Sequence, residues 1–99
     1  MNDYLIVYRP PRATFVEDIT EREAAVIGEH FEYLKTLLAE GALLIAGRTE
    51  DAVMGLAVFR AADDTMADEI MRNDPAVKGG VFTATLYPYR VALFAGKDQ

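Results

Sequence analysis

His30 is the only histidine in the chain, and its type and position suit acid/base chemistry. It falls in a predicted amphipathic helix, and at about 100° per residue it lies roughly 80° from the centre of the apolar stripe. At that edge of the buried face, an imidazole can contact the rim of a sheet and keep one nitrogen available as a general acid or base. The alternative is a boundary histidine that donates a single hydrogen bond.

Asp74 precedes Pro75 in the segment Asn73-Asp74-Pro75-Ala76. Proline suits the first position of a short helical turn, and an aspartate before it suits the cap, which is one interpretation of Asp74. The other is that this loop carboxylate lies beside His30, orients the imidazole and stabilises its charged form. The second interpretation predicts a catalytic pair of His30 and Asp74.

Arg48 follows Gly47 at the end of a predicted strand. A guanidinium at that position can bind the carboxylate or enolate of a substrate by a bidentate contact. The alternative is a solvated hairpin arginine that pairs with Glu50 or Asp51. Tyrosines can also line a pocket, but in strands they usually pack, so we rank them below His30.

No metal or cofactor site is predicted. The acidic group Asp63, Asp64, Asp68 and Glu69 has no histidine near it in the sequence, and acidic residues are favoured where a helix begins. Gly79-Gly80 matches neither a phosphate-binding loop nor a dinucleotide fingerprint.

The elements that must position these residues follow from periodicity and from turn residues. Apolar runs predict strands at Tyr4–Tyr8, Ala42–Ala46, Val53–Phe59 and Val81–Leu93. Apolar residues at helical spacing, with Thr20 and Glu23 as a capping box and Gly41 as the stop, predict a helix over Thr20–Glu40. A second, shorter helix has Asp63 and Asp64 at its start, before the amphipathic residues from Met66, and ends before Asn73. Pro88 within the last strand indicates an edge position, a bulge or a break.

This βαββαβ order predicts an α+β ferredoxin-like sandwich, with a four-stranded antiparallel sheet and two helices on one face. The run Tyr4–Tyr8 is continuously apolar, which predicts a strand buried on both faces. Two helices can cover only one face of the sheet. We therefore expect a homodimer that pairs sheet against sheet, and a higher oligomer stays open.

Composition bounds the function. A length of 99 residues predicts a single domain over residues 1–99, and a hydrophobic content of 52% is enough for a packed core. A net charge of −6 without a basic cluster argues against nucleic acid and against anionic membranes as partners. The N-terminal apolar run is too short for a signal peptide or a membrane span. The absence of cysteine fits a reducing compartment, so we expect a cytoplasmic location.

Several of these segments together resemble the YciI-like (YCII-related) family. They are Tyr4–Tyr8, His30–Leu34, Glu40–Gly47 and Asn73–Val81, and the histidine and the Asp-Pro loop are the most specific of them. The resemblance implies a ferredoxin-like dimer, often a dimeric α/β barrel, and a site of histidine and aspartate that carries over onto His30 and Asp74. Family members commonly have proline after the Ala-Gly pair. Here Arg48 follows Gly47, which implies a changed pocket rim and favours an acidic ligand.

The leading hypothesis is a cofactor-independent acid/base enzyme of lyase or isomerase type, acting on a small acidic or aromatic molecule. His30 would be the base, Asp74 its orienting partner and Arg48 an anion holder. A second hypothesis is a dimeric module that binds a small ligand or a partner protein without transforming it. A third is a structural dimerisation unit, which predicts no enclosed polar pocket.

Overall fold

The computed structural model describes residues 1–96, which form four strands and four helices, with a layer of helices packed on a layer of strands. The strands are β1 (Asn2–Arg9), β2 (Leu43–Arg48), β3 (Gly55–Ala61) and β4 (Thr83–Tyr89). The helices are α1 (Phe15–Asp18), α2 (Glu21–Ala39), α3 (Asp64–Arg72) and α4 (Pro75–Lys78). Within the described range, no helix is long and apolar enough to cross a membrane. The predicted single domain over 1–99 stays a prediction, and its last three residues lie outside the described part.

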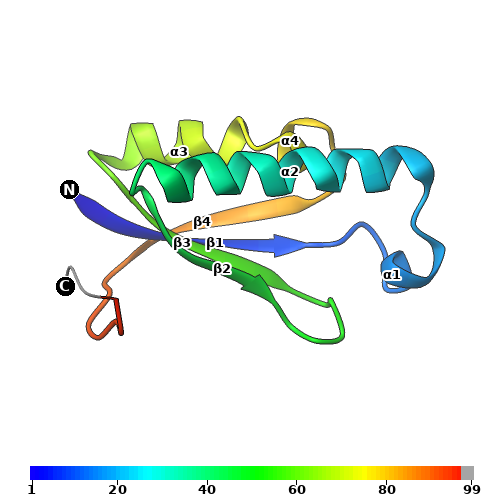
Figure 1. The fold of residues 1–99 in the computed structure, drawn as a ribbon, viewed down its shortest axis with the longest axis horizontal. Helices are drawn as coiled ribbons and strands as arrows, with labels where there is room; N and C mark the ends of the chain where they lie inside the picture. The colour runs from blue at the N-terminus through cyan, green and yellow to red at the C-terminus, as the bar shows by residue number, and fades with distance from the viewer. Residues whose placement is uncertain (97–99) are drawn as a thin grey trace.

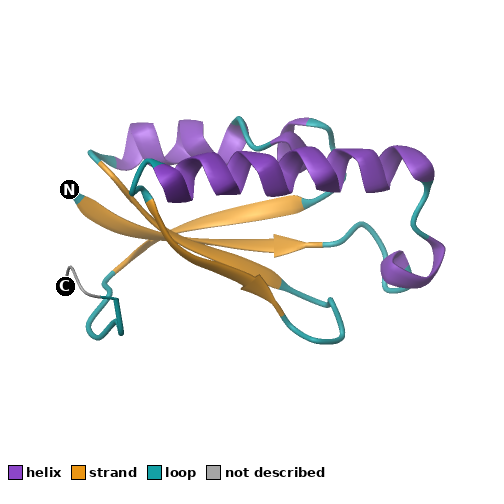
Figure 2. Ribbon diagram, in the orientation of Figure 1, coloured by secondary structure: helices purple, strands orange, loops and turns teal. Residues whose placement is uncertain are grey.

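The four strands form one antiparallel sheet in the order β2-β3-β1-β4. Helices α2, α3 and α4 cover one face of this sheet, as Figure 2 shows, and the opposite face is open. Helix α1 lies at the end of the molecule, between β1 and α2 (Figure 1). The predicted ferredoxin-like α+β fold is confirmed.

Strand β1 alternates between the two faces instead of being buried on both. Tyr4, Ile6 and Tyr8 face the helices and are 1–4% exposed, whereas Leu5 and Val7 are only half-buried. The prediction of a strand buried on both faces is therefore wrong for the single chain. Successive side chains of a strand point to opposite faces, and only one face is covered by helices.

Helix α2 begins and ends as its sequence predicts. Thr20 and Glu23 form the capping box, and Gly41 has a φ of +83°, which glycine adopts without the steric penalty that other residues pay. The apolar stripe of α2 is wider than the part of the helix that the sheet covers. Leu34 and Leu37 pack onto the sheet, whereas two other apolar residues on the flank toward β2, Phe31 and Leu38, are 60% and 56% exposed.

The last strand is shorter than predicted. Val81 and Phe82 donate their backbone N–H groups to the carbonyl of Ala76, so the chain is still completing the α4 turn where the strand was expected to begin. At its other end, Val91 donates to the Asp3 carboxylate and not to the ladder. Strand β4 is an edge strand, which is one of the three arrangements that Pro88 left open. The α1 turn was not predicted, because four residues give no periodicity.

Candidate active site

Asp74 is the buried centre of the site, where it both caps α4 and lies beside His30. Its side chain is 0% exposed, and it caps α4, where Oδ1 accepts from the Ala76 N–H at 2.9 Å. Pro75 occupies the first turn of α4, where its missing N–H costs no hydrogen bond. The cap therefore fixes the carboxylate below α2.

His30 meets this carboxylate from α2. Its Nδ1 lies 2.7 Å from Oδ1 and 2.9 Å from Oδ2 of Asp74, and the His30 side chain is 12% exposed. The imidazole packs edge-on against two aromatic rings, Tyr8 at 5.1 Å and Phe82 at 5.6 Å between centroids, with interplanar angles of 80° and 83°. The three rings form one cluster, because the Tyr8 and Phe82 rings are themselves 6.0 Å apart.

Tyr8 is the third member of the group, and the sequence analysis ranked it below His30. Its hydroxyl donates to Oδ2 of Asp74 at 2.8 Å, from the buried face of β1. Burial and the neighbouring Asp74 charge raise the pKa of the Tyr8 phenol far above its usual value, so the hydroxyl keeps its proton. The residue pattern of Tyr4–Tyr8, which is apolar throughout, held no signal for this role; the alternating burial of β1 in the structure places Tyr8 on the helix-covered face.

The hydrogen bonds fix the tautomer of His30. The Asp74 carboxylate accepts from the Ala76 N–H and from the Tyr8 hydroxyl, and an ionised carboxylate offers His30 only acceptors. Nδ1 therefore carries a proton, and in the neutral ring Nε2 is the unprotonated nitrogen. Nε2 has no hydrogen-bond partner among residues 1–96. Every buried polar side-chain atom in that range does have a partner, so Nε2 is not among the buried atoms. Nε2 is therefore accessible.

A cavity of about 630 Å³ adjoins His30 and lies between α2 and the β2 edge of the sheet. Its walls are mostly apolar and include the rings of Phe15, Phe31 and Phe82. Such a cavity, with a few polar groups that converge on it, has the form of a small-molecule site. An imidazole in its wall can take a proton from a bound molecule or return one.

Arg48 also lines this cavity, at the end of β2. It is exposed, and its Nη1 donates to the backbone carbonyls of Thr49 and Glu50 at 3.0 and 3.1 Å. Within residues 1–96 it forms no ion pair with the carboxylate of Glu50 or Asp51, so the predicted hairpin pairing is wrong. The backbone carbonyls of the turn lie closer to the guanidinium than those carboxylates do.

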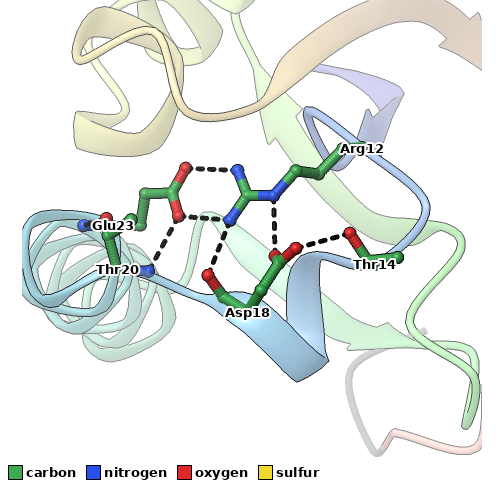
Figure 3. A network of polar contacts seen from close by, with 5 residues as sticks. All are labelled: Arg12, Thr14, Asp18, Thr20 and Glu23. Carbon is green, nitrogen blue, oxygen red and sulfur yellow. Dashed lines mark hydrogen bonds and ion pairs between the residues drawn. The ribbon is translucent and has the colours of Figure 1, made fainter.

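A polar network joins α1 to the start of α2 (Figure 3). Arg12 donates to both carboxylate oxygens of Glu23 at 2.8 Å and to Oδ1 of Asp18 at 2.7 Å. The Arg12 hydrogen bonds, with the Thr20 N–H, lower the pKa of Glu23 to about 2. Phe15 of α1 lines the cavity and packs edge-on against Phe82, with 5.8 Å between ring centroids. Phe82 in turn contacts the His30 ring.

The acidic group of α3 has the structural role that its position suggested. Asp63 is the N-cap of the helix and accepts from the Met66 N–H at 2.9 Å. Across residues 1–96 no group of three or more histidine, cysteine, aspartate or glutamate side chains is arranged to hold a metal ion.

Comparison with known proteins places the chain in a family. The model of the YCII-related domain matches residues 3–88, which include His30, Asp74, Tyr8 and Arg48. The chain belongs to the YCII-related family. A search of curated proteins gave no match for this YCII-related chain.

A solved structure shares the fold of this YCII-related domain. It is 5-chloro-2-hydroxyhydroquinone dehydrochlorinase (TftG) from Burkholderia phenoliruptrix, in complex with 2,5-dihydroxybenzoquinone. The two chains are 18% identical, the match covers 88% of this chain and 93% of that chain, and the TM-score is 0.64. At this identity the similarity establishes the fold alone.

Proposed function

We propose that this chain is a single-domain cytoplasmic enzyme that moves a proton on a small molecule, of lyase or isomerase type, with its own side chains and no cofactor. His30 is the base, Asp74 is its orienting partner, and Arg48 holds an anionic group of the substrate. One observation carries the proposal: Nδ1 of His30 is bound to a fully buried carboxylate, Nε2 has no hydrogen-bond partner within residues 1–96, and the His30 side chain lines a cavity.

The chemical step begins when a substrate C–H or O–H bond gives its proton to Nε2. The electron pair left behind forms an enolate or a new double bond. In a lyase, a neighbouring group then departs with its own bonding pair, and in an isomerase the imidazolium returns the proton to another atom. The Asp74 charge stabilises the imidazolium in the meantime, and such positioned proton transfer typically contributes about 10² to 10⁴ in rate.

The fold relative supports the lyase form of this proposal. TftG is named a dehydrochlorinase, and removal of hydrogen chloride is an elimination that needs a proton acceptor. Its complex contains a dihydroxybenzoquinone, a flat acidic molecule. A ligand of that kind would suit a cavity with aromatic walls and the cationic Arg48.

Turnover of a small panel tests the proposal, beginning with 5-chloro-2-hydroxyhydroquinone. Chloride release and product absorbance are followed for the wild type, for His30→Gln, and for Arg72→Gln as a control on an exposed arginine of α3. We expect His30→Gln to lower kcat by about 10² or more, and Arg72→Gln to change nothing. Undiminished turnover by His30→Gln would show that His30 is not the base.

The mostly apolar lining of the cavity favours a second candidate, a binding module that does not transform its ligand. Under this alternative, 2,5-dihydroxybenzoquinone raises the melting temperature of the wild type and of His30→Gln equally. It is then recovered unchanged after long incubation. Conversion of the ligand by the wild type alone would exclude this candidate.

We also propose that the open sheet face forms a homodimer. The antiparallel register puts Leu5, Val7, Leu56 and Tyr87 on this face, and Tyr87 is 46% exposed. A contiguous apolar face of this kind is expected to be covered in solution. Sedimentation velocity should give twice the chain mass for the wild type and for the helix-face control Thr36→Glu, and a monomer for Val7→Glu. Equal masses for all three would contradict the dimer.

A further inference from the structure

The charges that line the cavity differ from those of the whole protein. The chain has 16 acidic and 10 basic residues, a net charge of −6. The residues of the described chain that line the cavity include Lys35, Arg48 and His30, and none of them is an aspartate or a glutamate. A cavity with cationic groups in an acidic protein attracts anions while the surrounding surface repels them, which is a basis for selection.

Both cations are available to a ligand. Arg48 uses Nη1 for the turn carbonyls, and within residues 1–96 its Nε and Nη2 donate no hydrogen bond. Lys35 comes from the other wall, on α2, and its Nζ lies 3.3 Å from a carboxylate oxygen of Glu32. The two side chains of that pair are 56% and 71% exposed, and exposed pairs of this kind are weak. A ligand anion can therefore replace Glu32 at Lys35.

The apolar surface around the cavity is larger than a single ring requires. Phe31 and Leu38 of α2 both line it and are more than half exposed. A cavity of about 150 Å³ is enough to hold benzene, and this one has about 630 Å³. Two fused rings, or a ring with an apolar tail, would cover the exposed side chains that a single ring leaves in water.

We propose that the cavity takes an amphipathic organic anion whose apolar body is larger than one benzene ring and whose carboxylate, phenolate or enolate is bound jointly by Lys35 and Arg48. The apolar body lies against Phe31, and the acidic end lies at the rim. The inference names the substrate class of the site described above and so rests on the proposed function. It makes Lys35, on the opposite wall from Arg48, a second determinant of specificity.

Binding of matched ligands tests this class without any turnover. The probes are 2-naphthoate, the neutral 2-naphthamide of the same shape, and benzoate, each titrated into ¹⁵N-labelled protein and followed by ¹H–¹⁵N NMR. We expect 2-naphthoate to bind about tenfold more tightly than either of the others, with shifts in α2 and β2, and more weakly as salt is added. The double variant Lys35→Gln/Arg48→Gln should bring 2-naphthoate to within about twofold of 2-naphthamide.

The controls separate charge from structure. Lys35→Arg and Arg48→Lys keep the charge and should keep the preference, and Arg72→Gln removes an exposed charge far from the cavity lining and should keep it too. Equal binding of acid and amide, or no binding of 2-naphthoate at millimolar concentration, would overturn the inference. So would shifts confined to the open sheet face, or a preference that survives the double variant. None of these outcomes bears on whether His30 is a base, which chloride release measures separately.

Discussion

Replacing Asp74 with Asn keeps the shape of the side chain but turns one acceptor oxygen into a donor. The cap survives, because Oδ1 can still accept from the Ala76 N–H and asparagine is as good a cap as aspartate. At the other position, the new NH₂ group would face the Tyr8 hydroxyl, which now donates to Oδ2 at 2.8 Å. The Tyr8 hydroxyl is buried, so its proton would lose its partner.

The cost follows from that orphaned donor and from the weakened His30 contact. A buried donor without a partner costs about 1–3 kcal/mol, and replacing a charged acceptor at His30 adds about 1 kcal/mol. We expect Asp74→Asn to lower the free energy of unfolding by about 2–4 kcal/mol. In a domain of this size, that corresponds to a fall in Tm of roughly 10–25 °C.

A double-mutant cycle with Tyr8→Phe measures the coupling by urea unfolding at neutral pH. In the Tyr8→Phe background there is no hydroxyl to orphan, so Asp74→Asn should cost at least about 1 kcal/mol less than in the wild type. Thr36→Ala, on the exposed face of α2, serves as the control for a change outside the network. Additive effects, or an Asp74→Asn variant as stable as the wild type, would refute the three-donor network.

Three further predictions concern stability. Because the folded protein raises the pKa of Tyr8, the stability that the protonated hydroxyl contributes is fully present below the ordinary phenol pKa of about 10 and is lost as the pH rises above it. In urea unfolding, the stability advantage of the wild type over Tyr8→Phe should therefore shrink as the pH rises above about 10, and an advantage that does not change there would contradict the buried hydrogen bond. The pKa of Glu23 is lowered from 4.5 to about 2, so the stability that its carboxylate contributes is present above pH 4.5 and is lost as the pH falls toward 2. In Glu23→Gln, the free energy of unfolding should therefore depend less steeply on pH in that window than in the wild type. Equal pH dependence in the two proteins would contradict the Arg12 network. A Cβ at Gly79 would lie 2.8 Å from the Pro75 carbonyl oxygen, whereas one at Gly28 in α2 meets nothing within 4 Å. Calorimetry should find that Gly79→Ala destabilises the protein and that Gly28→Ala stabilises it by about 0.5–1 kcal/mol. The reverse order of stability would contradict the close backbone approach at Gly79.

Local rules predicted the parts of the fold that depend on neighbouring residues. The capping box at Thr20, the stop at Gly41 and the Asp74 cap each rest on contacts a few residues apart, and all three are present. Pro88 narrowed the last strand to an edge position, a bulge or a break, because proline cannot donate to a ladder, and the structure has the edge position.

The site depends on contacts that no local rule reaches. His30 and Asp74 are 44 residues apart and Tyr8 and Asp74 are 66 apart, so only the completed fold brings them together. Residue type and spacing raised His30 and Asp74 as an acid/base pair, and the family resemblance implied the same two residues, but nothing in the pattern selected Tyr8 from five tyrosines. The predicted partners of Arg48 were wrong for a similar reason: it donates to the backbone carbonyls of Thr49 and Glu50, and a pattern of side chains does not predict where backbone carbonyls point.

The tautomer of His30 tests the central claim most directly, and the chain offers one histidine to observe. A long-range ¹H–¹⁵N NMR spectrum of the free protein above neutral pH separates the two ring nitrogens. We predict a proton on Nδ1 and an unprotonated Nε2 in the wild type. A wild-type imidazole that carries its proton on Nε2, or exchanges freely between the two forms, would contradict an Asp74-oriented base.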